Sequence, residues 1–487
     1  MNAPIRRLAT VVAALFAALL ISTTMIQFVF AKSINARPDN RRTLLSTFGV
    51  QRGQILADGK AVAESVPSDD EYKWQRKYTQ AELYAHVTGY YSFLYGAGGG
   101  LEGSENDLLS GSSDKLFYQR ISDLLTGKKP RGASLTTTID AAAQRAAEEG
   151  LGNQRGAAIA IDPRTGAILA MVSHPSYDPN VLASHDIDAT VKAWRTLTTD
   201  KSQPMVNRTI AGNLYPPGST FKLVTAAAAL SSGKFTPSSV LPGQAVLDLP
   251  GTTVGLPNDG HVPCSPTGKV TLTEALRVSC NPAFGQLGMD LGQDAVRAQA
   301  AKFGVGDELA VPMRVTPSVF PTGLNEAQLA QSSIGQFDVR MTPLQVAMIS
   351  AAIANRGVVM KPYLVKSAIV DSELSVVDRA QPERLSEAVT PEVANELKSM
   401  MIGVVQGGTG TAAQIPGVEV AGKTGTAETA AGANPDAWFT GFAPANGTPK
   451  VAVAVIVEDG GNAGSEAAGG RVAGPIARDI MKAVLGE

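Results

Sequence analysis

Ser219 and Lys222, a serine and a lysine three residues apart, are the pair whose types and spacing could do chemistry in this 487-residue chain. Residues 216–218 are Pro-Pro-Gly and residues 223–230 are strong helix formers, which predicts a buried helix beginning at or near Ser219. Side chains with this spacing share one helix face and can touch. A serine hydroxyl is a poor nucleophile unless a base lies beside it, and a buried lysine with a lowered pKa can be that base. The helix N-terminus would add free N–H groups where an oxyanion forms.

Ser-x-x-Lys alone is weak evidence, because a helix cap followed by a solvated lysine has the same spacing. Two further segments strengthen the hypothesis. Ser279-Cys280-Asn281 follows an amphipathic stretch at 272–278, and Lys423-Thr424-Gly425-Thr426 follows an apolar stretch that begins at 418. Motifs of these three types occur together, in this order, in active-site-serine β-lactamases and penicillin-binding proteins. The sequence therefore predicts one cleft built from three distant segments.

The elements around these segments predict an α+β domain. Apolar runs at 157–161 and 168–172, joined by Asp-Pro-Arg-Thr-Gly, are typical of a hairpin. A helix-rich stretch covers about 219–405, and strand patterns return at 418–424, 437–442 and 451–457. Apolar residues at four-residue steps over 472–485 predict a helix that covers a sheet. We expect the strands at the two ends of this domain to close into one sheet.

The N-terminus predicts a membrane anchor. Arg6 and Arg7 precede an uncharged run from Leu8 to Ala31, and about 23 residues at 1.5 Å each give roughly 35 Å, enough to cross a bilayer core. The run is longer than the apolar core of a usual signal peptide, which favours an uncleaved anchor over a cleaved leader. The arginines favour a cytoplasmic N-terminus and place the rest of the chain outside the cell membrane. We divide the chain into an anchor (1–31), an N-terminal pedestal or interaction module (32–150) and a catalytic domain (151–487).

Composition argues against several other classes of protein. The chain has 42 Lys+Arg and 44 Asp+Glu, a net charge of −2, so a nucleic-acid partner is not expected. The histidines are scattered without metal-ligand spacing, so neither a metal nor a cofactor is expected; they are His86, His174, His185 and His261. The stretch at 95–102 is a glycine-rich loop that leads into a helix; it lacks the Gly-Lys-Ser/Thr of a phosphate loop, and a flexible connector is the alternative.

With its three motifs, the chain resembles the class B penicillin-binding proteins, the membrane-anchored D,D-transpeptidases of peptidoglycan synthesis, and among them the actinobacterial penicillin-binding protein A group. Further stretches carry the resemblance along the chain: 161–170, 207–208, 333–336, 342–345, 408–411 and 438–442, with 100–102 and 109–111 in the upstream module. Three features depart from the pattern, namely Cys280 inside the second motif, Phe337 where glycine is common, and a shortened Arg-Gly signature at 52–59.

The resemblance implies a fold and a reaction. The expected fold is an antiparallel five-stranded sheet flanked by helices, after a single transmembrane helix and a small extended module. Ser219 would attack the carbonyl between the last two D-alanines of a stem peptide, and an amine of a neighbouring peptide would accept the acyl group. Penicillins and other β-lactams would stop the reaction at the acyl-enzyme. The reaction would serve cell wall synthesis during growth or division.

The same resemblance implies a role for each residue of the motifs. Lys222 would take the serine proton with its pKa held down partly by Lys423, Ser279 would relay a proton to the leaving D-alanine, and Asn281 would hold Lys222 and the substrate amide. Lys423, Thr424 and Thr426 would bind the terminal carboxylate, and the N–H groups of Ser219 and Thr426 would form the oxyanion hole. Implied partners are a SEDS-family glycosyltransferase and divisome or elongasome proteins.

Cys264 and Cys280 are the two cysteines of the chain. Outside the membrane a pair is expected to be oxidised, which favours a disulfide over two buried free thiols. The bridge would close a loop of roughly 15 residues, worth about 3 kcal/mol.

Two rival functions use the same pocket. A β-lactamase must hydrolyse its acyl-enzyme quickly, but the Glu-x-x-Leu-Asn element that class A enzymes use does not occur between 281 and 423. A non-catalytic scaffold or β-lactam sensor would keep the motifs, yet a sensor needs a multi-span transducer and one span is predicted here. A glycosyltransferase head is not expected, because the upstream module is short.

Overall fold

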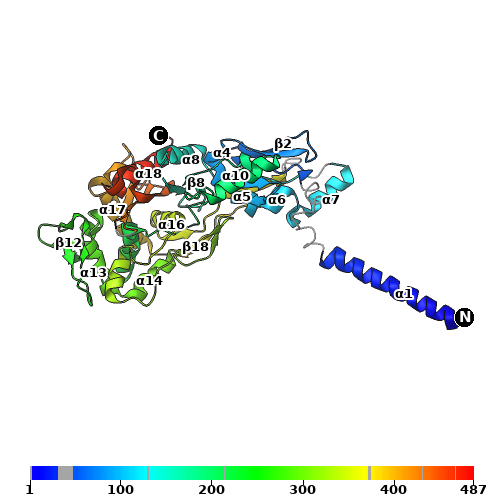
Figure 1. The fold of residues 1–487 in the computed structure, drawn as a ribbon. Coiled ribbons are helices and arrows are strands. Elements are labelled where there is room, and N and C mark those ends of the chain that lie inside the picture. Colours follow the sequence, from blue (N-terminus) through cyan, green and yellow to red (C-terminus); the bar gives the residue numbers. More distant parts are fainter. Residues whose placement is uncertain are drawn as a thin grey trace.

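The computed structural model describes residues 3–30, 48–128, 131–212, 214–370, 375–429, 432–466 and 468–487. The first helix, α1 (Ala3–Thr24), continues as a π-helical turn, η1 (Met25–Val29), and its side chains are exposed along its length (Figure 1). Within the described residues, Ala3–Val29 is the one helix long and apolar enough to cross a membrane. An all-round apolar, unpacked helix of this length suits lipid on every side.

The N-terminal module is built on a six-stranded sheet in the order β17-β16-β6-β1-β2-β3. Two of these strands, β16 (Val365–Val370) and β17 (Ser375–Arg379), come from much later in the chain, and β16 pairs with β6 through Ala368 and Leu135. A division at residue 150 by sequence position therefore leaves two strands of this sheet in the other part. The other elements of the module are β1 (Ile55–Ala57), β2 (Lys60–Pro67), β3 (Trp74–Tyr78), α4 (Ala81–Thr88), β4 (Tyr90–Ser92), β5 (Gly96–Gly98), α5 (Gly100–Ser104), α6 (Asn106–Ser110), η2 (Asp114–Leu116), α7 (Phe117–Thr126) and β6 (Ser134–Thr137).

The glycine-rich stretch at 95–102 leads into a helix, as predicted, and the alternative of a flexible connector is wrong. It forms β5, which pairs with β4, and then α5, which carries the fully buried Glu102. Arg52 and Arg76 each donate a 2.6 Å hydrogen bond from Nε to this carboxylate. The two guanidinium groups hold the pKa of Glu102 below its usual value despite the opposing effect of burial. Arg52, in the shortened Arg-Gly signature, is thus one of the two arginines that pair with buried Glu102, and it ties the segment before β1 to α5.

The catalytic domain is organised around a five-stranded sheet in the order β19-β20-β21-β7-β8, with every neighbouring pair antiparallel. The predicted closure of the sheet from both ends of the domain is confirmed, since β21 (Val451–Val457) pairs with β7 (Gly156–Ile161). All six residues of β7 are buried. Ala157 and Ile159 face one hydrophobic cluster and Ala158 and Ala160 face another, so a continuous apolar run serves both faces of the strand.

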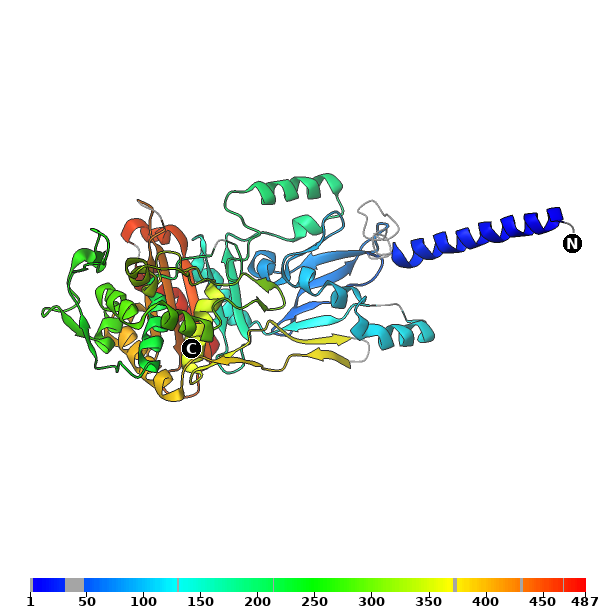
Figure 2. The same ribbon diagram turned by 90° about the horizontal axis from the view of Figure 1, so that it is seen from below.

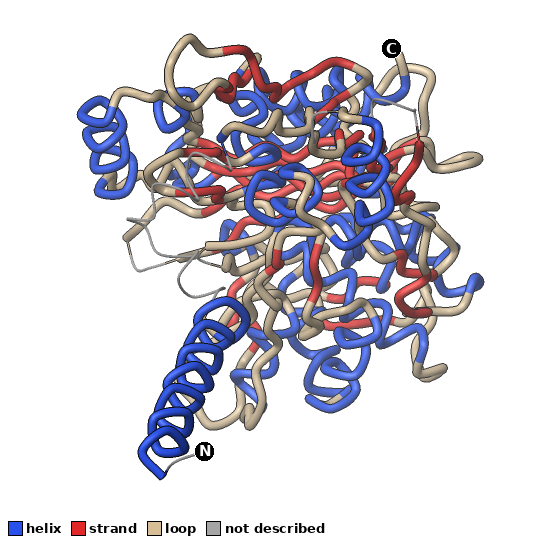
Figure 3. The backbone as a smooth tube through the Cα atoms, turned by 90° about the vertical axis from the view of Figure 1, so that its right-hand side faces the viewer, coloured by secondary structure: helices blue, strands red, loops and turns tan. Residues whose placement is uncertain are grey.

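Helices cover both faces of this sheet. In the molecule as a whole the strands run through the middle, with helices on either side (Figure 3). On one face α8 (Ala141–Leu151) and α18 (Gly469–Leu485) pack together and against the strands, as the apolar spacing at 472–485 predicts. On the other face α16 (Pro343–Ala354) lies against β7, β20 and β21. The α+β class, the five-stranded sheet and its flanking helices are as expected from the sequence.

The end of the catalytic domain far from α1 is mostly helical (Figure 2), and the remaining elements complete this domain. They are β8 (Ile168–His174), α9 (Asn180–Ala183), α10 (Ile187–Thr199), η3 (Gly218–Phe221), α11 (Lys222–Ser231), β9 (Val240–Pro242), β10 (Val246–Leu247), β11 (Leu256–Pro257), η4 (Asp259–His261), β12 (Lys269–Thr271), α12 (Leu272–Arg277), α13 (Asn281–Leu291), α14 (Gln293–Lys302), β13 (Leu309–Ala310), β14 (Arg314–Val315), α15 (Glu326–Ser333), β15 (Val358–Met360), β18 (Arg384–Glu387), α17 (Pro391–Gly407), η5 (Thr411–Ala413), β19 (Ala421–Ala427), β20 (Asp436–Ala443) and η6 (Glu458–Glu466).

Candidate active site

The three motif segments meet in one cleft of about 260 Å³. Each of the segments contributes to its lining, with these residues: Ser219, Ser279, Asn281, Thr424, Gly425 and Thr426. The two lysines of the motifs, Lys222 and Lys423, lie beneath this surface with fully buried side chains. The spatial convergence that the motif order predicts is therefore present.

Ser219 sits on a tight turn rather than inside an α-helix. The turn is the 3-10 segment η3, and α11 begins only at Lys222. Side chains three residues apart eclipse one another in 3-10 geometry. Gly335 supports the turn from behind: its carbonyl accepts a 3.0 Å hydrogen bond from the Gly218 N–H, and a Cβ on Gly335 would lie 2.1 Å from the Gly218 oxygen. Only glycine fits at this contact.

Lys222 is held by the second motif. Its Nζ donates to the Ser279 carbonyl oxygen at 2.7 Å and to Asn281 Oδ1 at 2.6 Å, and it lies 3.3 Å from Ser279 Oγ. Burial lowers the pKa of Lys222 well below its usual value, and the positive charge of Lys423 lowers it further. A lysine whose pKa is lowered in this way is a candidate base for a neighbouring hydroxyl.

The predicted contact between Lys222 and Ser219 is not made in this structure. Among the described residues, Lys222 Nζ forms its hydrogen bonds with the second motif and none with Ser219 Oγ. Asn281 Oδ1 and a main-chain carbonyl are strong acceptors that occupy the amine. Catalytic hydrogen bonds are often loose in an unliganded site and tighten when substrate binds.

Ser279 joins the two lysines. Its Oγ accepts a 2.9 Å hydrogen bond from Lys423 Nζ, which also donates to the Thr424 carbonyl oxygen at 2.8 Å. Burial lowers the pKa of Lys423 to about 7. Ser279 has a φ of 62°, a left-handed conformation that non-glycine residues seldom adopt outside functional sites. The arrangement can pass a proton between a serine hydroxyl and either amine.

The orientation of Asn281 depends on two residues that the motif search missed. Asn281 Nδ2 donates to the Pro257 carbonyl oxygen at 3.0 Å, so its Oδ1 is turned toward Lys222. The Asn281 N–H donates to Asn258 Oδ1 at 3.1 Å, and Asn258 Nδ2 donates to the Val262 carbonyl oxygen at 2.9 Å. An asparagine in a loop that shares no motif with Asn281 gives no sequence signal for this function.

The third motif lies on β19, at the edge of the sheet. β19 begins at Ala421, three residues later than expected from the sequence. Thr424 Oγ1 and Thr409 Oγ1 share a 2.6 Å hydrogen bond, so the Gly-Thr-Gly-Thr stretch at 408–411 abuts the motif. A Cβ on Gly425 would lie 3.0 Å from the Pro217 carbonyl oxygen, so the strand passes close to the turn that carries Ser219. A substrate carboxylate at this strand would meet hydroxyls and the Lys423 amine together.

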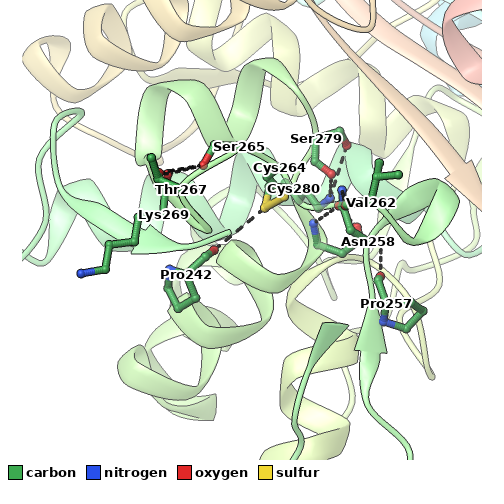
Figure 4. The surroundings of a disulfide bond; sticks show 12 residues. Pro242, Pro257, Asn258, Val262, Cys264, Ser265, Thr267, Lys269, Ser279 and Cys280 are labelled. Atoms are coloured by element: carbon green, nitrogen blue, oxygen red, sulfur yellow. Dashed lines mark hydrogen bonds between the residues drawn. A yellow bond between two sulfur atoms is a disulfide. The ribbon is translucent and has the colours of Figure 1, made fainter. Parts of the chain in front are cut away.

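Cys264 and Cys280 form the predicted disulfide, with 16 residues of sequence separation (Figure 4). Cys280 is fully buried and precedes Asn281, the first residue of α13. Figure 4 shows the bridge between Ser265 and Thr267 on one side and Asn258 and Ser279 on the other. The bridge therefore holds the second motif against the loop that orients it, and a ring of this size is worth about 3 kcal/mol.

A second buried polar cluster contacts the segment that precedes the Ser219 turn in the sequence, and no sequence motif predicts it. The Tyr215 hydroxyl donates to Glu458 Oε1 at 2.6 Å, and Arg208 Nε donates to the same oxygen at 2.9 Å. Burial, together with the negative charge of Glu458, raises the pKa of the nearby Asp436 to about 7. Trp438 Nε1 donates to the Pro216 carbonyl oxygen at 3.1 Å. Together these contacts fix the segment that leads into the nucleophile.

Residues 156–482 match the family described as penicillin binding protein transpeptidase domain, and residues 52–135 match the penicillin binding protein A dimerisation domain. The chain is 43% identical to the peptidoglycan D,D-transpeptidase PbpA of Mycolicibacterium smegmatis over 496 aligned residues, covering 100% of both chains. The chain belongs to the penicillin-binding protein transpeptidase family.

Solved structures of this family agree with the fold. A ceftriaxone acyl-enzyme complex of penicillin-binding protein A from Mycobacterium tuberculosis superposes with a TM-score of 0.86 at 42% identity, over 91% of this chain and 100% of that one. The penicillin G acyl-enzyme complex of the same protein gives a TM-score of 0.84 at 42% identity, over 90% of this chain and 100% of that one. The resemblance to the penicillin-binding protein A group is confirmed.

Proposed function

We propose that this penicillin-binding protein is a membrane-anchored peptidoglycan D,D-transpeptidase that cross-links stem peptides through an acyl-enzyme on Ser219. The observation that carries the proposal is the geometry of the cleft: Ser219, partly exposed on an otherwise buried turn, lines the same cleft as Ser279, whose Oγ accepts a hydrogen bond from the buried amine of Lys423. Neutral lysine amines beside two hydroxyls are suited to move protons at neutral pH.

In the first half of the reaction Lys222 takes the proton of Ser219 as Oγ attacks the carbonyl between the last two D-alanines. The Oγ–C bond forms, the C–N bond breaks, and the terminal D-alanine leaves with a proton relayed through Ser279. The N–H groups of Ser219 and Thr426 stabilise the oxyanion. Loss of one such donor typically costs about 10²–10³ in rate.

In the second half an amine of a neighbouring stem peptide attacks the acyl carbon. The new C–N bond forms, the Oγ–C bond breaks, and the amine proton returns to the enzyme. A β-lactam follows the first half only, because its leaving group stays attached to the acyl product and remains in the cleft. Lys423, Thr424 and Thr426 bind the carboxylate in both cases.

Asn281 is a positioning residue for Lys222 in this scheme. Its Oδ1 holds Nζ at 2.6 Å while its Nδ2 is fixed by the Pro257 carbonyl oxygen. The same amide lies at the wall of the cleft, where it can also bind the substrate backbone.

The charge pattern of the anchor supports a reaction on the outer side of the cell membrane. Arg6 and Arg7 keep the N-terminus in the cytoplasm, α1 spans the bilayer once, and the chain after residue 31 is extracytoplasmic. Residues 32–150 act as the pedestal between the anchor and residues 151–487. A SEDS-family glycosyltransferase and proteins of the divisome or elongasome are the partners that this arrangement suits, through α1 and the pedestal.

One experiment separates the transpeptidase from its rivals. The full chain in detergent and its Ser219→Ala variant are incubated with fluorescent penicillin, and separately with a stem peptide that ends in D-Ala-D-Ala and carries an acceptor amine. The transpeptidase retains the label and forms cross-linked dimer, and the variant does neither. Rapid loss of label would favour a β-lactamase, and stable label without product would favour a sensor.

A further inference from the structure

One helix of the N-terminal module has its apolar side facing out. In α7 the large apolar residues Phe117, Tyr118, Ile121 and Leu125 are 50%, 85%, 44% and 82% exposed. In the same helix Asp123 is 7% exposed. A surface helix of a soluble protein has the opposite arrangement, with its apolar stripe on the core.

The exposed residues form one continuous stripe. Phe117, Ile121 and Leu125 follow each other at four-residue steps, and Tyr118 lies beside them at three residues from Ile121. Residues with these spacings lie along one helix face. A contiguous exposed apolar patch of this kind marks a surface that contacts something other than water.

The charge around the helix is basic. Between Lys115 and Arg131 the sequence has five basic residues and one acidic residue, and the acidic residue is the buried Asp123. One of the basic residues, Lys115, pairs with Asp378. Large apolar residues on one face with lysine and arginine around them are typical of helices that lie flat in the surface of an anionic bilayer.

The chain connection allows α7 to reach the membrane. Arg131, five residues after the end of α7, pairs with Gln51 in an isolated bridge. Gln51 lies a few residues after the segment 31–47 that follows α1, and those 17 residues can reach at most about 60 Å. In both ribbon views α7 lies at the end of the module nearest α1 (Figures 1 and 2).

We propose that α7 is a second membrane contact, which lies in the headgroup region of an anionic bilayer with Phe117, Tyr118, Ile121 and Leu125 inserted. The proposal rests on α1 being the membrane anchor and goes beyond the transpeptidase reaction. A single anchor leaves the catalytic domain free to tilt, whereas an anchor together with an interfacial helix fixes the height and orientation of the cleft above the membrane.

Depth-dependent quenching tests the contact on the full chain. Both native cysteines are in the disulfide, so Leu125→Cys provides a unique thiol for an environment-sensitive fluorophore. The labelled chain is reconstituted into vesicles of phosphatidylcholine and phosphatidylglycerol that contain lipid with a nitroxide high on the acyl chain. Ile187→Cys is the matched control, because Ile187 is a 57% exposed aliphatic residue on another surface helix, α10.

We expect the label at residue 125 to shift to the blue and to lose most of its fluorescence to the nitroxide, while the label at residue 187 changes little. Phe117→Ser with Ile121→Ser should abolish the quenching at 125, and vesicles without phosphatidylglycerol should weaken it. Equal quenching at 125 and 187 would overturn the proposal. A blue shift without quenching would place a protein, such as a second copy, on α7 and would also overturn it. Co-flotation of the chain with the vesicles tests the α1 anchor separately.

Discussion

Lys423 Nζ lies 2.9 Å from Ser279 Oγ, although the two residues are 144 positions apart. This hydrogen bond links the second and third motifs, and the same Oγ accepts a longer, 3.3 Å hydrogen bond from Lys222 Nζ, so one hydroxyl connects both buried amines. A proton that leaves Ser219 can therefore reach the leaving group through a single hydroxyl.

Ser279→Ala should break this connection. We expect the second-order rate constant for acylation by penicillin G to fall by about 10²–10⁴, the usual contribution of a positioned proton-transfer group. Ser265→Ala is the matched control, because Ser265 lies in the adjacent disulfide loop and bonds the Lys269 carbonyl oxygen outside the cleft. Acylation of Ser279→Ala at the rate of this control would exclude the relay.

Asn258→Ala should weaken acylation through Asn281. It removes the acceptor for the Asn281 N–H, and a lost buried hydrogen bond costs about 1–3 kcal/mol, which is roughly a 5- to 100-fold lower rate. As Asn281 loosens its hold on the Lys222 ammonium, the pKa of Lys222 falls further, and the acid limb of the acylation rate should move to lower pH.

Asn355→Ala controls for the loss of a loop asparagine, because its side chain donates to the Val358 carbonyl oxygen away from the cleft. If Asn258→Ala matched Asn355→Ala in both rate and pH profile, Asn258 would have no part in positioning the base.

Phe337 stands where glycine is common in the family, and a substitution there can measure the free-energy cost of that difference. Its φ is 59°, a left-handed conformation in which glycine is unstrained, and that explains why glycine is common at this position. Phe337→Gly and Phe337→Ala both lose the ring, but only glycine relieves the backbone. We expect the glycine variant to be more stable than the alanine variant by about 1 kcal/mol, measured as the difference in unfolding free energy in urea. Equal stability of the two would show that φ is not strained in the native chain.

The sequence was sufficient to predict those elements that depend on a local pattern of residue types. The Ser219 motif, the continuous apolar run of β7 and the four-residue steps of α18 each follow from spacing, and the structure has all of them. The pairing of β16 with β6, which adds β16 and β17 to the sheet of the N-terminal module, could not be predicted. Nothing in the short sequence of β16 indicates that its partner is β6.

The sequence also could not predict residues whose function depends on a contact with a residue distant in the chain. The buried ion pairs of Glu102 were not predicted because its two arginine partners are distant in the sequence, and Asn258 carries no motif of its own. The contact between Lys222 and Ser219 was overstated, because spacing gives proximity but not which acceptor the amine prefers.

Asp436 should make stability depend on pH. Its pKa is about 7 in the folded chain against 3.8 for a free carboxyl, so its contribution to stability is complete below pH 4 and is lost as the pH rises through 7. Asp436→Asn keeps an acceptor for the Asp459 N–H without the buried charge. We expect the variant to be more stable than wild type at pH 8, by at most about 4 kcal/mol, and to lose that advantage near pH 4.

The thermal midpoints of the two chains from pH 4 to pH 8 measure this effect. A difference between them that stays constant over the whole range would mean that Asp436 does not titrate in this window.

The central claim is that the Ser219 hydroxyl is made reactive by the neutral amine of Lys222. The most direct measurement is the rate at which penicillin G adds one penicilloyl group to the chain, followed by intact mass and located by peptide mapping from pH 5 to pH 9. We predict a single adduct on Ser219 that forms more slowly as the pH falls and is lost in Lys222→Met. An adduct on another residue, or a Lys222→Met variant that is acylated at the wild-type rate, would contradict the account.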